Sequence, residues 1–114
     1  MFANNSGLLQ GTLELLVLKT LSWGPMHGFE ITSWLERQSG GRLGFTDAAL
    51  LQALHRLEAQ KFLVASWGET EKGRTARYYE MTAAGRRHYR AESEALLENV
   101  RAMIAVLGVA NAGR

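Results

Sequence analysis

The sequence contains no cysteine and a single proline among its 114 residues. Without cysteine the chain can form neither a disulfide framework nor a thiolate zinc site, and it has no cysteine nucleophile. The absence fits a reducing compartment, and the cytoplasm is the expected location. Any regulatory switch in this chain must therefore act through a ligand, a partner or a proton rather than through a thiol.

A long apolar segment is also missing. The most apolar stretch, residues 8–23, contains Gln10, Glu14 and Lys19, whereas a transmembrane helix needs about 20 largely apolar residues. No basic residue precedes Lys19, although a secretory signal opens with positive charge. We therefore expect no membrane partner.

The overall amino-acid composition is typical of one small folded domain. Apolar residues make up 46% of the chain, which is ordinary for a globular protein and too high for a disordered one. The length fits one domain with an extra helix that docks a partner. The formal net charge of +2 excludes a strongly polybasic protein but leaves a local basic patch open.

Apolar spacing predicts three helices in the first half of the chain. The first lies within residues 8–23, where Thr12 is a candidate N-cap. The second covers residues 28–38 and ends at a serine followed by two glycines. The third begins at Thr46 or Asp47, both good N-cap types, and runs to about residue 61. Its inner face is a stripe of leucines spaced by four and three residues, namely Leu50, Leu54 and Leu57.

The apolar period then changes from that of a helix to that of a strand. Residues 62–67 and 76–81 are rich in branched and aromatic side chains, which predicts the two strands of a hairpin. Lys72 and Gly73 are the expected tip, because glycine tolerates a positive φ. A two-stranded hairpin is marginal on its own in water, so it must pack against the helices.

A long final helix is predicted over residues 83–107, with Thr82 as its N-cap and Gly85 as a local weakness. Its inner positions from Tyr89 to Leu107 are spaced by 4, 3, 4, 3 and 4 residues, which is a heptad pattern. This face either packs onto its own domain or pairs with a second copy. A core of roughly 80 residues needs only part of such a helix, so a homodimer is favoured. The expected interface residues are Tyr89, Leu96, Val100, Met103, Ile104 and Leu107.

The order of these elements predicts a mainly α chain with a small β-hairpin, in the α+β class. Two helices joined by a tight glycine-containing link and followed by a hairpin are typical of a winged helix-turn-helix, to which a long C-terminal dimerisation helix is added. The expected boundaries are a flexible N-terminus at 1–7, a DNA-binding domain at 8–81, the dimerisation helix at 82–108 and a frayed tail at 109–114.

The third helix is the predicted recognition helix, because the second helix of a helix-turn-helix enters the major groove with its N-terminal residues on base edges. Gln52 could read adenine through its amide, Leu51 could contact a thymine methyl group, and Arg56 could bind guanine or phosphate. If the helix phase is shifted by one residue, Leu51 belongs to the core instead. The expected recognition residues are Thr46, Asp47, Ala48, Leu51, Gln52, His55 and Arg56.

The charge is unevenly distributed along the chain. Between Lys72 and Arg90 there are six basic residues, opposed only by Glu80. On a protruding hairpin such side chains could neutralise DNA phosphates by releasing counterions, although a charge run is also typical of a solvated surface. The expected wing contacts are Lys72, Gly73, Arg74 and Arg77.

Two segments of the chain resemble the PadR-type winged-helix transcriptional regulators. They are LLQGTLELLVLKTLSWGPMHGFEI, which looks like the start of that family, and ALHRLEAQKFLVASWGETEKGRTARYYEMTAAGRR, which is similar to its third helix, wing and last helix. Together they cover about residues 8–90. The resemblance implies a homodimeric DNA-binding repressor, often released by a small ligand, in a compact subgroup with one C-terminal helix. Two pairs depart from the family pattern: Leu51-Gln52 replaces the usual Tyr-Pro, and Gly28-Phe29 replaces a frequent Gly-Tyr.

A small metal-dependent enzyme is one alternative. His27 with Glu30, and His55 with Glu58, stand at i and i+3, which places each pair on one helix face. The two further glutamates of a di-iron bundle have no counterpart, and neither a nucleophile elbow nor a P-loop is present. We therefore expect no metal, no cofactor and no catalysis.

Two other questions remain open at this point. A winged helix can also serve as a protein–protein interaction module without specific DNA binding. A dimer groove lined by aromatic residues could hold a small aromatic effector, for which Trp34 and Tyr89 are the candidate contacts. The expected partners are thus a double-stranded DNA operator with two half-sites, a second copy of the chain and such an effector.

Overall fold

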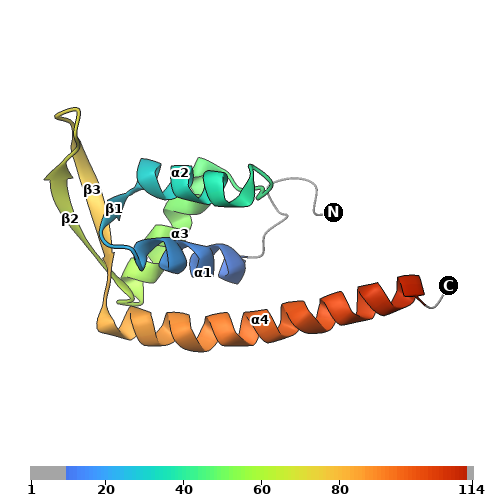
Figure 1. The fold of residues 1–114 in the computed structure, drawn as a ribbon. Coiled ribbons are helices and arrows are strands. Elements are labelled where there is room, and N and C mark those ends of the chain that lie inside the picture. Colours follow the sequence, from blue (N-terminus) through green and yellow to red (C-terminus); the bar gives the residue numbers. More distant parts are fainter. Residues whose placement is uncertain (1–9, 113–114) are drawn as a thin grey trace.

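The computed structural model describes residues 10–112 and confirms a mainly α chain with a small β-component (Figure 1). The elements are α1 (Gln10–Leu21), β1 (Met26–His27), α2 (Gly28–Ser39), α3 (Asp47–Ala59), β2 (Leu63–Glu69), β3 (Thr75–Met81) and α4 (Ala83–Ala112). No helix among these residues is long and apolar enough to cross a membrane. The segment 1–7, predicted to be flexible, lies outside the described residues.

The sheet has three strands rather than the predicted two. Strand β1 pairs antiparallel with β3, so that Met26 lies opposite Tyr79 and His27 opposite Tyr78. The strand order β1-β3-β2 makes β3 the central strand. A hairpin that is marginal alone is thereby tied to the segment that leads into α2.

Helix α1 forms the centre of the hydrophobic core. It contacts α2, α3, α4 and β3, and Val17, Leu18 and Leu21 are almost completely buried in it. Burying each such leucine contributes about 1.5–3 kcal/mol. The buried Thr20 is satisfied within its own helix, because its hydroxyl donates to the Leu16 carbonyl oxygen at 2.9 Å.

Three helices begin at side chains that accept orphan backbone N–H groups. Thr46 Oγ1 accepts from the Ala49 N–H at 3.0 Å, and Thr82 Oγ1 accepts from the Gly85 N–H at 3.0 Å. His27 and Glu30 form a capping box at the start of α2. Thr12, in contrast, lies inside α1, so its prediction as an N-cap is wrong.

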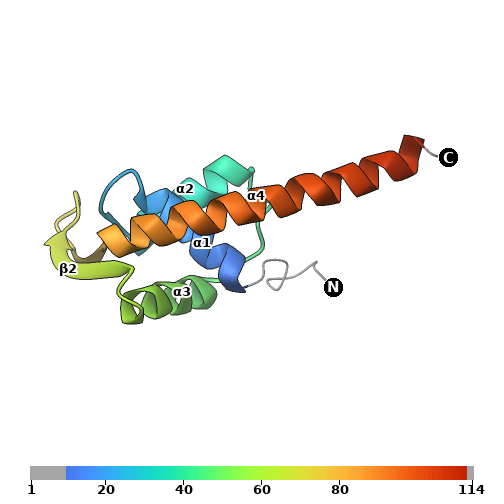
Figure 2. The same ribbon diagram turned by 90° about the horizontal axis from the view of Figure 1, so that it is seen from below.

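Helix α4 begins at Ala83 as predicted but ends later than predicted. Gly85, predicted to be a local weakness, lies at a close contact, because a Cβ there would lie 2.3 Å from the Phe62 carbonyl oxygen. The helix also continues to Ala112, past the expected end near residue 107 and into the segment predicted to be frayed. Figures 1 and 2 show α4 lying along α1 and then extending well beyond the rest of the chain.

Candidate nucleic-acid interface

Helix α3 has one buried and one exposed face. Leu50, Leu54 and Leu57 are buried together with Ala53, whereas Leu51 is 49% exposed. The predicted helix phase is therefore correct, and Leu51 does not belong to the core. The residues that share its exposed face are Asp47, Ala48, Gln52 and His55.

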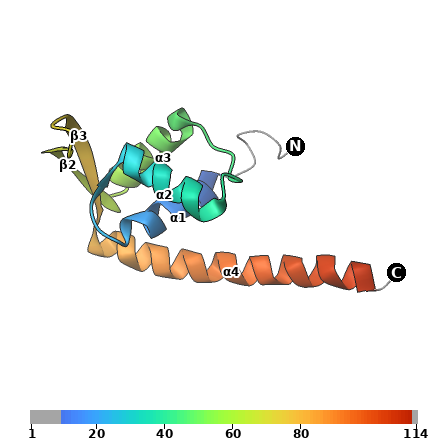
Figure 3. The same ribbon diagram turned by 45° about the horizontal axis from the view of Figure 1, so that its top comes forward.

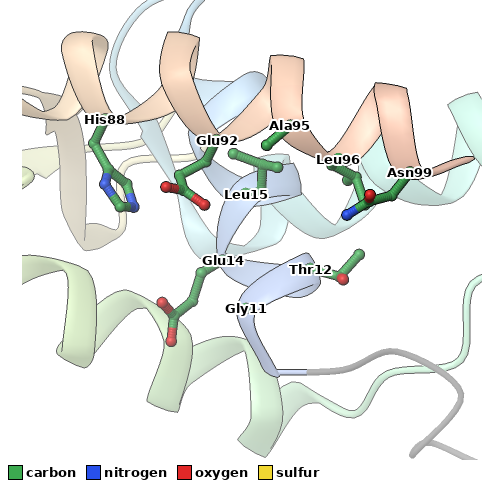
Figure 4. A pocket seen from close by; sticks show the side chains of 9 residues that line it. All are labelled: Gly11, Thr12, Glu14, Leu15, His88, Glu92, Ala95, Leu96 and Asn99. Carbon is green, nitrogen blue, oxygen red and sulfur yellow. The ribbon is translucent and has the colours of Figure 1, made fainter.

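Arg56 stands apart from the other predicted recognition residues. Its Nε donates to Glu14 Oε2 on α1. Figure 4 shows the Glu14 carboxylate directed toward α3. The guanidinium is thus engaged in holding α3 against α1, and only its remaining donors are available to another group. Sequence reasoning missed this role because Glu14 lies 42 residues away along the chain.

The hairpin of β2 and β3 forms the wing. Its turn is closed by the Thr70 N–H, which donates to the Arg74 carbonyl at 2.8 Å, and by Gly73, whose φ is 80°. Lys72, Gly73 and Arg74 are exposed at the tip. Neither Lys72 nor Arg74 belongs to any of the ion pairs within residues 10–112.

Arg77 occupies a different place, at the base of the wing. Its Nη2 donates to Glu58 Oε2 at 2.8 Å, and its guanidinium lies 5.6 Å from the centroid of the Trp67 ring. Glu58 belongs to the last turn of α3, while Trp67 and Arg77 face each other across β2 and β3. These contacts set the position of the wing relative to α3, so Arg77 is a positioning residue.

We expect Arg77→Met to lower the free energy of unfolding by about 1 kcal/mol, because a partly exposed ion pair and a cation–π contact each contribute about 0.5–1 kcal/mol or less. Urea unfolding of Arg77→Met, Glu58→Gln and the double variant measures the coupling directly. A coupling of about 0.5 kcal/mol is expected between the two residues. Strict additivity would mean that the pair does not join the wing to α3.

The wing tip and α3 lie on the same side of the chain. In Figure 3 both are found on one side of α1, whereas α4 runs along the other. The two groups of exposed residues therefore belong to elements on the side of the chain away from α4. We call the exposed residues of α3 and the wing tip the α3–wing surface, comprising Asp47, Ala48, Leu51, Gln52, His55, Lys72, Gly73 and Arg74.

One His-x-x-Glu pair caps a helix, and the glutamate of the other forms an ion pair. His27 Nδ1 accepts from the Glu30 N–H at 3.4 Å, and Glu30 Oε1 accepts from the His27 N–H at 3.1 Å. Glu58 instead pairs with Arg77. Within residues 10–112, no three His, Asp or Glu residues converge where they could hold a metal ion.

A cleft of about 330 Å³ lies between α1 and α4 (Figure 4). Its lining includes Glu14, Leu15, His88, Glu92 and Leu96. Trp34 and Tyr89, the predicted effector contacts, do not line it. Both rings instead pack, partly buried, against the hydrophobic core.

The heptad face of α4 is divided between two environments. Tyr89 packs on its own core and Leu96 lines the cleft with α1, so both already contact their own chain. Met103, Ile104 and Leu107 are 54%, 62% and 69% exposed. The dimer interface predicted for the whole face is therefore available mainly in the C-terminal half of α4. Leu97 and Val106 add further exposed apolar area to the same helix.

Residues 17–91 match the model of the PadR-like family of transcriptional regulators. The chain belongs to this family. Membership places it among regulators rather than enzymes and agrees with the predicted fold. The chain is also 39% identical over 83 residues to an uncharacterized 37.1 kDa protein in transposon Tn4556 of Streptomyces fradiae, a match that covers 73% of this chain but only 22% of that protein.

Several solved structures share the fold. A transcriptional regulator from Clostridium thermocellum has a TM-score of 0.75 at 22% identity, covering 86% of this chain and 92% of that one. A PadR-like regulator from Bacillus cereus has a TM-score of 0.74 at 19% identity, covering 90% and 97%. Bacillus subtilis PadR, solved in complex with operator DNA, has a TM-score of 0.62 at 19% identity, covering 69% of this chain and 45% of that one.

Proposed function

We propose that this chain is a sequence-specific DNA-binding transcriptional regulator that works in the cytoplasm as a homodimeric repressor. The observation that carries the proposal is the α3–wing surface, where an exposed recognition face and the basic side chains of the wing tip lie on one side of the chain. A helix of this kind fits the major groove, and cations beside it fit the phosphates that flank the groove.

In this proposal, each residue class on the surface has its own task. The Gln52 amide donates to and accepts from an adenine edge, and Ala48 and Leu51 contact thymine methyl groups. Lys72 and Arg74 hold the backbone phosphates without reading sequence. Arg56 and Arg77, which pair with Glu14 and Glu58, act first by holding the recognition helix and the wing in register.

The exposed C-terminal half of α4 supports the homodimer, since it offers exposed apolar residues at heptad spacing. Two recognition helices then bind half-sites about 34 Å apart, or a multiple of that distance. An effector relieves repression only if it binds better to a dimer geometry that spaces these helices wrongly. The α1–α4 cleft lies beside the proposed dimer helix and is the place where such a ligand could act.

Selection of bound sequences from random DNA tests the proposal and yields the operator. On that operator we expect Lys72→Ala with Arg74→Ala to weaken binding and to reduce the slope of log affinity against log salt by up to about two units, roughly one for each basic side chain removed from a phosphate. Titrations by fluorescence anisotropy at several salt concentrations measure both quantities.

The control is Lys19→Ala with Arg101→Ala, which removes the same charge from α1 and α4, away from the α3–wing surface. This variant should keep the slope of the parent. Equal slopes for the wing variant and the parent would show that the wing does not contact phosphate. If no sequence is enriched and no steep salt dependence is found, the fold serves as a protein–protein interaction module instead.

A further inference from the structure

An apolar groove opens between the N-terminal ends of α2 and α3, beside the exposed face of α3. It has a volume of about 460 Å³ and is lined by Phe29, Thr32, Asp47, Leu50, Leu51 and Leu54. Leu50 and Leu54 form its floor from the core, since both are buried. Phe29 is 76% exposed, whereas Ile31 and Leu35 on the same helix are buried and Trp34 is partly buried against the core.

The Phe29 ring is held in place although it is exposed. It stacks on the His27 ring with 6.5 Å between centroids, and His27 in turn meets Tyr78 edge-on at 5.3 Å. His27 is fixed by its capping box with Glu30. The row of rings runs from the central strand of the sheet to the mouth of the groove, where Phe29 forms one wall.

The chemistry of the groove selects its occupant. No basic residue lines it, and its one charged group is the Asp47 carboxylate, so a phosphate group is disfavoured by charge. The apolar group that the major groove of DNA presents is the C5-methyl of a pyrimidine, and a carboxylate can accept from a neighbouring exocyclic amino group. Leu51 belongs both to the groove and to the α3–wing surface, which makes the groove continuous with the proposed reading face.

We propose that Phe29 and Leu51 form a reading site for the C5-methyl group of a thymine, at or next to the adenine contacted by Gln52. This inference rests on the proposed DNA-binding function and deepens it. Leu51 supplies the wall from the recognition helix and Phe29 the wall from α2, with the methyl group held between them. Phe29 is then a specificity residue although it lies outside the recognition helix.

The test replaces each thymine of the selected operator, one at a time, by deoxyuridine, which removes only the methyl group. We expect one position in each half-site at which affinity falls about fourfold, the effect of losing one buried methyl group of about 0.8 kcal/mol. Leu51→Ala and Phe29→Ala should each bind the thymine and deoxyuridine operators at that position equally well. Phe29 is largely exposed and Leu51 is half exposed, and neither belongs to the buried core, so neither substitution threatens folding.

Val64→Ala is the matched control, because Val64 is an exposed apolar residue on β2 that does not line the groove. This variant should keep the fourfold preference. Specific binding that is insensitive to deoxyuridine at every thymine would overturn the reading site while leaving the proposed function intact. A preference that survives in both Leu51→Ala and Phe29→Ala would place methyl reading elsewhere. Failure to select any operator would overturn the proposed function and this inference with it.

Discussion

Gly85→Ala will destabilise the chain by about 3 kcal/mol, at the upper end of the range for an overpacked core. A Cβ at this position would lie 2.3 Å from the Phe62 carbonyl oxygen and 2.9 Å from Met81 Cγ. The first contact is with backbone, which cannot turn aside as a flexible side chain can. Each kcal/mol corresponds to about 4–8 °C in Tm for a domain of this size, so the melting temperature should fall by about 12–24 °C.

The hydrogen bonds around Gly85 show why the junction cannot relax. The Phe62 carbonyl accepts from the Thr82 N–H at 3.0 Å. Thr82 Oγ1 donates to the Lys61 carbonyl at 2.8 Å and accepts from the Gly85 N–H at 3.0 Å. Lys61 already has a φ of 68°, in the left-handed region. Moving Phe62 away from a new methyl group would break these bonds and separate the start of β2 from the start of α4.

Gly11→Ala is the control, because Gly11 is also near the start of a helix and a Cβ there meets nothing within 4 Å. Alanine is a better helix former than glycine, so this variant should be stabilised by about 0.5–1 kcal/mol. Thermal unfolding followed by circular dichroism compares the two directly. Equal stability of the two variants would show that the contact between α4 and Phe62 is loose.

Local patterns in the sequence were sufficient for most of the fold. The spacing of Leu50, Leu54 and Leu57 determines which face of α3 is buried, and Thr46 and Thr82 cap their helices as predicted. Strand β1 could not be predicted in this way. It has only two residues, too few for an alternating pattern, and it exists because β3, far later in the chain, offers a free edge.

The candidate site was predictable only in part, for a related physical reason. Exposure follows from helical period, so the exposed positions of α3 were predicted correctly. The helical period does not predict which partner a long side chain will contact. Both Arg56 and Arg77 pair with glutamates from other elements. The aromatic residues show the same limit, since Trp34 packs on the core while Phe29 remains exposed on the same helix.

Met103→Glu with Leu107→Glu will convert the proposed dimer into a monomer of 12.6 kDa. Both side chains are exposed in the single chain, so the new carboxylates remain in water there and the free energy of unfolding of the monomer should change by less than about 0.5 kcal/mol. In a paired helix the same carboxylates would lose their water without a partner, which costs several kcal/mol for each charge. Sedimentation velocity measures the conversion from dimer to monomer. Met103 and Leu107 are better test positions than Leu96, because Leu96 also lines the cleft with α1 and its substitution would affect the monomer as well.

Ala102→Glu with Ala105→Glu is the matched control on the same stretch of α4. It adds two carboxylates at exposed positions outside the heptad stripe, so it should remain dimeric if the stripe is the interface. If Met103→Glu with Leu107→Glu still sediments as a dimer, the copies meet elsewhere. If both variants dissociate, the added charge itself rather than the stripe is responsible.

The Met103→Glu, Leu107→Glu variant also separates the effect of dimerisation from the effect of base recognition. Its α3–wing surface is unchanged, so the monomer should still bind a single half-site with the affinity of one recognition helix and one wing. What it loses is the linkage between two half-sites, which multiplies affinity by about 10²–10⁴ when the spacing matches the protein. Affinity for the full operator should therefore fall to nearly that for a half-site, with the thymine preference at Phe29 and Leu51 retained. A monomer that binds the full operator as tightly as the parent would mean that α4 does not set the spacing of the recognition helices.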